Sequence, residues 1–103
     1  MVSIVENWSY VDGRIEDVRP GDGGAVAITV RVARVAAVER SAGTFYPNFA
    51  EGREGSALRI RLPEPAARKL APAVGQTVRA RVRRGQAPDE FFAHPDDVSV
   101  IRP

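Results

Sequence analysis

The 103-residue chain contains no cysteine and has a single histidine, a single lysine and a single tryptophan. Without cysteine it can form no disulfide, thiolate nucleophile or thiolate zinc site, so the fold must depend on its hydrophobic core. No segment approaches the roughly 18 consecutive apolar residues of a membrane span, and the first residues, "MVSIVENWSY", lack the basic and apolar regions of a secretory signal. These absences predict a cytoplasmic protein that does not engage a membrane.

What the chain does contain is typical of a globular domain, since 44% of its residues are hydrophobic and 27% are charged. The length suits one core, and we therefore expect a single domain over residues 1–103. The 15 basic and 13 acidic residues give a net charge of only +2, but every basic residue except Lys69 is arginine. Arginine pairs with phosphate through two hydrogen bonds and stacks on bases. A GC-rich coding sequence would supply the same arginines without any such role.

Apolar and polar residues alternate in four segments, "AVAITVRV", "ALRIRLP", "TVRARVRR" and "DDVSVI", as they do in half-buried β-strands. The arginines of these segments are therefore expected on the outer faces of strands. The apolar residues are predicted to form one core: Val26, Ile28, Val30, Val32, Leu58, Ile60, Leu62, Val78, Val82 and Val98.

Two irregularities interrupt the strands. In the first of these segments the apolar phase slips after Ala33 and is continued by Val35 and Ala37, which predicts a long strand with a β-bulge from about residue 25 to residue 39. Before it, "WSYVDGRIEDV" predicts a first strand that is broken or bent at Gly13.

One short helix is predicted over residues 64–71, in "EPAARKLAPAV", because one proline suits its first turn and a second proline ends it. Ala66, Leu70 and Val74 recur there at helical spacing. Glycine and proline predict loops at residues 19–24, 40–55 and 84–90. The second of these loops is long and is expected to be flexible.

The order strand, strand, strand, helix, strand, strand resembles the oligonucleotide- and oligosaccharide-binding (OB) fold. The resemblance is carried by the glycine-interrupted first strand, the bulged second strand, the helix at 64–71 and "VGQTVRARV". The closing "HPDDVSVI" is similar to the end of small OB domains found on transport ATPases that recognise oxyanions. The resemblance implies an all-β fold, a small five-stranded OB-like barrel with one short helix between strands three and four. It also implies a ligand face across strands two and three, bounded by the loops that join strands 1–2 and 4–5.

Candidates for catalysis or metal binding are few. His94 stands beside Asp96 and Asp97, so nitrogen and oxygen ligands share one short segment. Aspartates before a strand commonly form Asx-type turns, and we favour that interpretation. The serines lack a nucleophile-elbow context, and "PGDGG" lacks the lysine and helix of a phosphate-binding loop and is interpreted as a hairpin turn. We expect no catalytic residue, no metal and no cofactor.

The aromatic residues of the long loop are the strongest candidates for ligand binding. "TFYPNF" brings Phe45, Tyr46 and Phe49 together in a polar, glycine-rich segment flanked by Arg40 and Arg53. Exposed rings beside arginines can stack on unpaired bases, at about 1–3 kcal/mol per base. Two alternatives remain open: the loop folds back and its rings cap one end of the barrel, or the rings form a subunit contact.

Two further aromatic pairs give weaker hints. Trp8 and Tyr10 would form a second stacking platform if they lie on the outer side of the first strand, but a bend in that strand would turn them inward. Phe91 and Phe92 stand where a strand begins, so one ring should be buried and only the other can be free.

The OB resemblance divides the arginines between surfaces. Those of the second and third strands would lie on or near the ligand face, with Arg84 at its rim. Arg79, Arg81 and Arg83 belong to the fourth strand, which closes against the first, and are expected to point elsewhere. The predicted nucleic-acid-binding residues are Arg31, Arg34, Phe45, Tyr46, Phe49, Arg53, Arg59, Arg61 and Arg84.

We therefore expect a non-catalytic OB-fold module that binds single-stranded nucleic acid, with Arg59, Arg61 and the aromatic loop forming one surface. The first alternative is a protein-interaction or assembly subunit that uses residues 44–49 to contact another protein or a second copy. The second is a small-anion or sugar-binding module. An enzyme is the least favoured interpretation.

Overall fold

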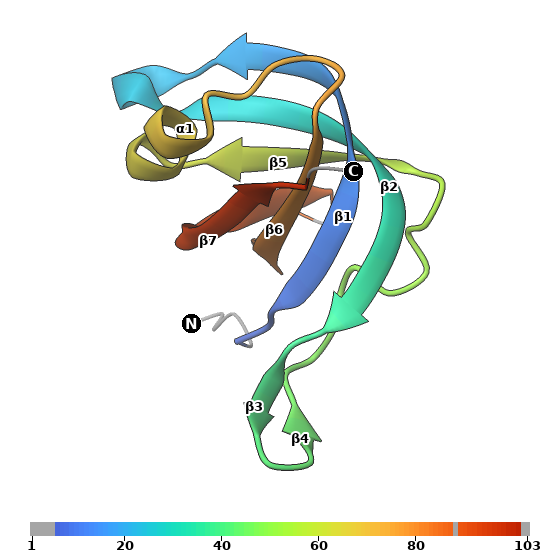
Figure 1. Cartoon of the computed structure of the whole chain (residues 1–103). Coiled ribbons are helices and arrows are strands. Elements are labelled where there is room, and N and C mark those ends of the chain that lie inside the picture. Colours follow the sequence, from blue (N-terminus) through green and yellow to red (C-terminus); the bar gives the residue numbers. More distant parts are fainter. Residues whose placement is uncertain (1–5, 88, 102–103) are drawn as a thin grey trace.

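The computed structural model describes residues 6–87 and 89–101. The prediction about a secretory signal concerns the first ten residues, of which residues 1–5 lie outside the described ranges. Five strands close into a barrel (Figure 1): β1 (Ser9–Pro20), β2 (Val26–Ala37), β5 (Ala57–Leu62), β6 (Thr77–Arg84) and β7 (Glu90–Val100). Their order around the barrel is β1-β2-β5-β7-β6, and every neighbouring pair is antiparallel except β5 and β7. The predicted small all-β barrel, with a helix between its third and fourth strands, is confirmed.

The core of the barrel is the predicted one. Of the ten predicted core residues, all except Val26 are buried, and Val26 packs half-buried at the margin. Leu58, Ile60 and Leu62 are at most 1% exposed, and burying each such side chain contributes about 1.5–3 kcal/mol. The residues between them are exposed, so β5 presents its arginines to the outside as the alternation predicted.

The predicted bend and the predicted bulge occur at the same place in the β1–β2 hairpin. Asp12 pairs with Arg34 and the next residue, Gly13, pairs with Val32, so Ala33 is the extra residue of a bulge. A Cβ atom on Gly13 would collide with a backbone carbonyl oxygen of β2. Only glycine allows the two strands to approach so closely. The two strands are joined by a short 3-10 turn, η1 (Asp22–Gly24), within the predicted hairpin loop.

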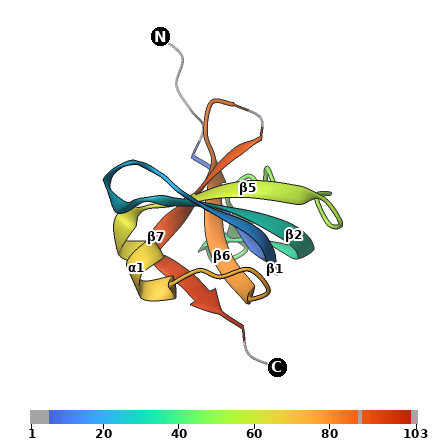
Figure 2. The same ribbon diagram turned by 90° about the horizontal axis from the view of Figure 1, so that it is seen from above.

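The helix α1 (Glu64–Leu70) packs beside β7 (Figure 2) and buries Ala66, Ala67 and Leu70. It ends where Ala71 adopts a left-handed conformation with φ of 48°. The predicted end of the helix is therefore confirmed, and Val74, which lies beyond it, is 66% exposed. In the described ranges no helix is long and apolar enough to cross a membrane.

The structure corrects the prediction of one long loop over residues 40–55. The strands β3 (Glu39–Ser41) and β4 (Thr44–Phe45) form a hairpin that projects from the barrel (Figure 1). Its turn contains Gly43 with a φ of 77°, a conformation that glycine adopts without a steric penalty. Strands of two and three residues are too short to show an alternation, which is why the sequence did not predict them.

The strand that was predicted to begin at Phe91 and Phe92 and the strand predicted over "DDVSVI" are one element, β7, which contains a wide bulge. Ala93 pairs with Val82 and Val98 pairs with Ala80, so the four residues 94–97 oppose Arg81 alone. The proline in this segment has no N–H to donate to a ladder, and a bulge is where a strand tolerates it. The bulge moves side chains of β7 onto the outer surface beside β6 and β1.

Candidate functional site

A row of two arginines and one phenylalanine crosses three neighbouring strands on the outside of the barrel. Arg61 on β5 pairs with Phe92 on β7, and Phe92 pairs in turn with Arg83 on β6. The guanidinium carbon of Arg61 lies 5.9 Å from the centre of the Phe92 ring, and that of Arg83 lies 5.0 Å from it. Both distances are in the range of cation–π contacts. Phe91 is buried in the core, so the prediction that only one ring of this pair is free is confirmed.

This row forms one wall of a mainly apolar hollow of about 260 Å³, which we call the Phe92 hollow. Its lining residues come from β5, β6, β7, the segment before β1 and the residue between β5 and α1: Trp8, Arg61, Pro63, Arg83, Phe92, Ala93 and Pro95. Among the described residues, neither of its arginines forms an ion pair. The hollow therefore combines a half-exposed ring with two positive charges that no carboxylate of residues 6–87 or 89–101 pairs with.

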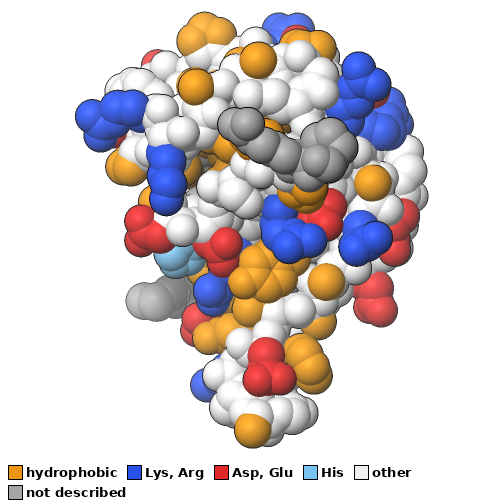
Figure 3. Space-filling model, in the orientation of Figure 1, with side chains coloured by type: hydrophobic (Ala, Val, Ile, Leu, Met, Phe, Trp, Pro, Cys, Tyr) orange, Lys and Arg blue, Asp and Glu red, His pale blue; other side chains and the backbone are white. Residues whose placement is uncertain are grey.

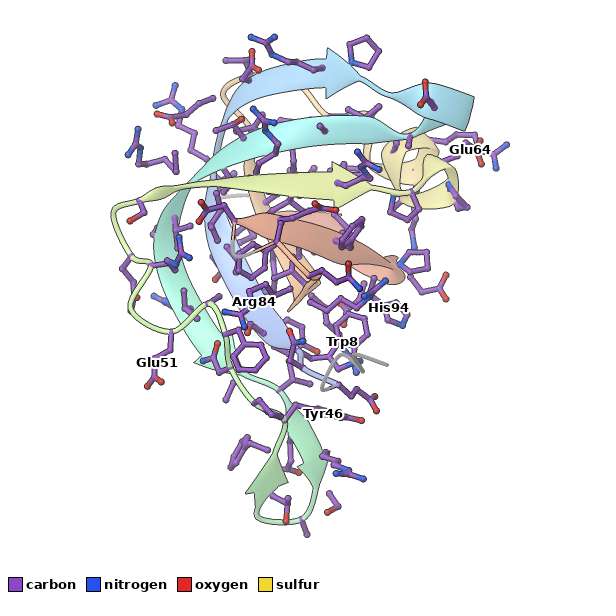
Figure 4. All side chains as sticks on the ribbon, turned by 180° about the vertical axis from the view of Figure 1, so that it is seen from behind. Trp8, Tyr46, Glu51, Glu64, Arg84 and His94 are labelled. Atoms are coloured by element: carbon purple, nitrogen blue, oxygen red, sulfur yellow. The ribbon has the colours of Figure 1, made fainter. Side chains whose placement is uncertain are left out.

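Trp8 extends the aromatic surface toward the β7 bulge. The guanidinium of Arg81 lies over the Trp8 ring at 4.8 Å, and the ring of His94 is tilted against Trp8 with centroids 5.3 Å apart. Figure 4 shows Trp8 and His94 side by side near β7. The Nδ1 atom of His94 accepts a hydrogen bond from the backbone N–H of Asp96 at 3.1 Å, so the segment forms a local turn through histidine rather than through aspartate. Within the described ranges, no three His, Asp or Glu side chains are arranged to hold a metal ion.

The face predicted to bind ligand, across β2 and β5, does contain a groove of about 570 Å³. Arg59 and Arg61 line it together, and Arg61 is shared with the Phe92 hollow. Acidic residues border the same groove: Asp89 precedes β7, and Glu90 is the first residue of that strand. Arg53 pairs with Asp89 at 3.3 Å, so this predicted site residue is already engaged.

The three rings of the long loop are separated in the structure. Phe49 is half-buried beneath Arg84, whose guanidinium carbon lies 4.2 Å from the ring centre. Tyr46 lies under Arg40 at 5.9 Å, at the base of the projecting hairpin (Figure 4). Phe45 is on the hairpin itself and is 54% exposed. The predicted single surface of Arg59, Arg61 and all three rings is thus not assembled, because the hairpin directs Phe45 away from β5.

The part of the loop around Phe49 is attached to one end of the barrel. The Ser9 hydroxyl donates a hydrogen bond to Asn48 Oδ1 at 2.6 Å, and the Trp8 N–H donates to the carbonyl of Pro47 at 3.3 Å. The Ala50 side chain is fully buried. The alternative in which the loop caps an open end of the barrel is therefore correct for this part of the loop.

The two predicted arginines of β2 are placed differently. Arg31 pairs with Glu16 at 3.1 Å and donates a further hydrogen bond to the carbonyl of Gly55 at 3.0 Å. Arg34 follows the bulge and lies in another groove, of about 590 Å³, which we call the Tyr10 groove. This groove crosses β7, β6, β1 and β2 and is lined by Tyr10, Asp12, Arg34, Ala36, Arg79, Asp97 and Ser99.

Two internal pairs set the charges of the Tyr10 groove. Arg79 donates to both carboxylate oxygens of Asp12, at 2.8 and 3.1 Å, and this hydrogen bonding raises the pKa of Arg79. The Tyr10 hydroxyl donates to Asp97 Oδ2 at 3.1 Å. Burial raises the pKa of Tyr10, and the hydrogen bond to Asp97 and the negative charge of that residue raise it further. Tyr10 is therefore a neutral hydrogen-bond donor in this groove.

The sequence did not predict that β6 contributes an arginine to this surface. The expectation that its arginines point away from the third strand is right for Arg79 but wrong for Arg83, because β7 lies between β5 and β6 and aligns Arg83 with Arg61. The row is formed by the register of the last strand with its two neighbours, and this register cannot be predicted from the pattern within any one segment. On the face shown in Figure 3, basic and acidic side chains are interspersed and form no region of a single sign.

No protein family model matches this chain, and no curated protein matches its sequence.

Proposed function

We propose that this protein is a non-catalytic OB-fold module that binds single-stranded nucleic acid in the cytoplasm. The barrel order β1-β2-β5-β7-β6, with a helix between the third and fourth barrel strands, is compatible with the OB fold and supports this assignment. The observation that carries the proposal is the row of Arg61, Phe92 and Arg83 on three neighbouring strands.

The chemistry of this row suits an unpaired strand. Every base has a π face that can stack on the half-exposed ring of Phe92, and guanidinium groups on either side of the ring can meet the flanking phosphates. Arg61 and Arg83 have no acidic partner among the described residues, so phosphate does not have to displace a carboxylate. Arg59 continues the same surface into the β2–β5 groove.

Binding of this kind should depend steeply on salt and weakly on sequence. Each arginine that meets a phosphate releases condensed counterions, and for single strands the slope of log K against log salt changes by about 0.7 per contact. Stacking on Phe92 adds affinity without changing that slope. The two contributions can therefore be separated in one titration.

A second candidate function rests on the projecting hairpin. Phe45 is 54% exposed on it, which suits a contact with another protein or a second copy. A Phe45→Ser change would abolish such a contact and leave nucleic-acid affinity unchanged. Light scattering of the pure protein, with and without this change, reports the self-association form of this candidate.

The proposed function is tested by fluorescence anisotropy with a labelled single strand of mixed sequence, titrated from low to high salt. The double variant Arg61→Ala/Arg83→Ala should bind more weakly and lower the salt slope by about 1.4, twice the single-strand value per contact. The matched control is Arg19→Ala/Arg68→Ala, whose arginines pair with Asp17 and Glu64. No binding by the intact protein at low salt, or equal losses in the two double variants, would refute the proposal.

A further inference from the structure

The Tyr10 groove contains none of the three residues, Arg61, Phe92 and Arg83, on which the proposed function rests. Its volume of about 590 Å³ lies within the range of roughly 300–1,000 Å³ that is typical of small-ligand sites. It is built by four neighbouring strands rather than by loops, because Asp97 and Ser99 come from β7, Arg79 from β6, and the remaining lining residues from β1 and β2. Such a site has a fixed shape.

The groove contains one charged side chain of each sign that forms no ion pair among the described residues. Asp12 is neutralised because Arg79 donates to both of its oxygens. Asp97 uses only Oδ2, toward the Tyr10 hydroxyl, and has no basic partner in the part of the chain that the structure describes. Arg34 is exposed and has neither an acidic partner nor a ring among those residues. A complementary ligand therefore carries an anion and a neutral hydrogen-bond donor.

The β7 bulge connects this groove to the Phe92 hollow. Pro95 lines the hollow and Asp97, two residues later, lines the groove. Between them lies Arg81 of β6, which opposes the bulge and stacks on Trp8. Arg81 is also the strand partner of Tyr10 on β1. A strand that passes Phe92 and Trp8 would thus arrive at Tyr10 across the β7 bulge, which also carries the exposed side chain of Asp96.

We propose that the Tyr10 groove is a subsite for one nucleotide of the bound strand and that it selects a base with an exocyclic amino group. This inference rests on the proposed function. The ring of Tyr10 offers a stacking surface, Arg34 pairs with the phosphate, and Asp97 Oδ1 accepts a hydrogen bond from the amino group.

The selectivity follows from whether the base presents a hydrogen-bond donor or an acceptor to the Asp97 carboxylate. Cytosine presents a 4-amino donor, which a carboxylate accepts well, whereas uracil presents a carbonyl oxygen at the same position. A carboxylate facing that oxygen would place two acceptors against each other, with no proton to share. Cytosine and uracil have the same size and differ mainly in this group, so the pair isolates the contact.

The experiment measures the anisotropy of labelled oligodeoxycytidylate and oligodeoxyuridylate of equal length at neutral pH. The intact protein should bind the cytosine oligomer about fivefold or more tightly, the lower end of the discrimination given by a good base contact. Asp97→Asn retains an oxygen that accepts from Tyr10 but removes the charge and adds a donor. This variant should lose most of the preference by binding the uracil oligomer better. The matched control Asp17→Asn, outside the groove, should keep the preference.

A second variant tests the phosphate contact. Arg34→Ala should weaken both oligomers equally and lower the salt slope by about 0.7, whereas Arg68→Ala, whose arginine is held by Glu64, should change neither. Strong but equal binding of the two oligomers would overturn the subsite and leave the proposed function standing. Absence of binding to either oligomer at low salt would overturn the proposed function itself. An Asp97→Asn variant that weakens both oligomers alike, without changing their ratio, would also overturn the subsite.

Discussion

Ten of the arginines that the structure describes fall into two sets that have no member in common. One set faces carboxylates: Arg19, Arg31, Arg53, Arg68 and Arg79. The other set faces aromatic rings: Arg40, Arg61, Arg81, Arg83 and Arg84. Four of the five ring-facing arginines belong to β5 and β6, the strands on either side of β7.

The difference between the two sets is a difference in available charge. A guanidinium paired with a carboxylate is locally neutral, so a phosphate gains little by approaching it. A guanidinium held over a ring keeps its full charge and is already oriented by the contact. The net charge of +2 therefore underestimates how attractive the β5–β7–β6 surface is to an anion.

The largest effect is expected from a change that destabilises the barrel, because both sets of arginines depend on the folded strands for their positions. Gly13→Ala places a methyl group against a carbonyl oxygen of β2 and against Val30, so the strands must separate locally. The change removes some freedom from the unfolded chain, which offsets part of the cost. We still expect a net loss of about 2–3 kcal/mol in the free energy of unfolding, measured by urea denaturation.

A glycine in open space provides the control for this change. Gly43 lies in the hairpin turn at positive φ, and no atom lies within 4 Å of the position that a methyl group would take there. Gly43→Ala should therefore cost only the backbone term of about 1–2 kcal/mol. A loss at Gly13 no larger than the loss at Gly43 would mean that the two strands are less closely packed than the structure indicates.

The next largest effect is expected when the ring between Arg61 and Arg83 is replaced by a carboxylate, so that both arginines face an acid instead of a ring. Phe92→Glu places a carboxylate between Arg61 and Arg83 and removes the stacking surface. Nucleic-acid affinity should fall by about tenfold or more, since stacking alone accounts for about 1–3 kcal/mol per base. Phe92→Leu keeps the apolar bulk and leaves both arginines unneutralised, so it should weaken binding less. Equal affinities of the two variants in the anisotropy assay would contradict the distinction between the two sets.

The inner face of the barrel was predictable from the sequence because it is a local property. Alternation in a strand fixes which side chains share a face, so Ile28, Leu58 and Ile60 could be assigned to the core without knowing which strands are neighbours. The bulge at Ala33 was visible for the same reason, as a slip of phase within one segment.

The outer surface was predictable only in part because it depends on register between distant strands. Arg61 and Arg83 are brought to one ring by the position of β7 between their strands, and no pattern within either segment contains that information. The bulge at 94–97 was missed because its proline and aspartates are as typical of a turn that precedes a strand. The candidate surface is therefore centred on Phe92 rather than on the aromatic loop.

The smallest effect is expected at Tyr10, where the two sets of arginines meet. Burial and the hydrogen bond to Asp97 raise the pKa of Tyr10 above its ordinary value of 10.0, while the charges of Arg81 and Arg79 oppose the rise. Because the folded-state pKa is above the unfolded one, the stabilisation by this hydrogen bond is present below the unfolded pKa and is lost as the pH rises through the folded value. In a Tyr46→Phe background Tyr10 is the remaining tyrosine, so the ultraviolet absorbance of phenolate reports it alone. Its midpoint should lie above that of the unfolded chain, and Asp97→Asn should lower it toward that reference; a midpoint at or below the reference would show that the two arginines outweigh Asp97.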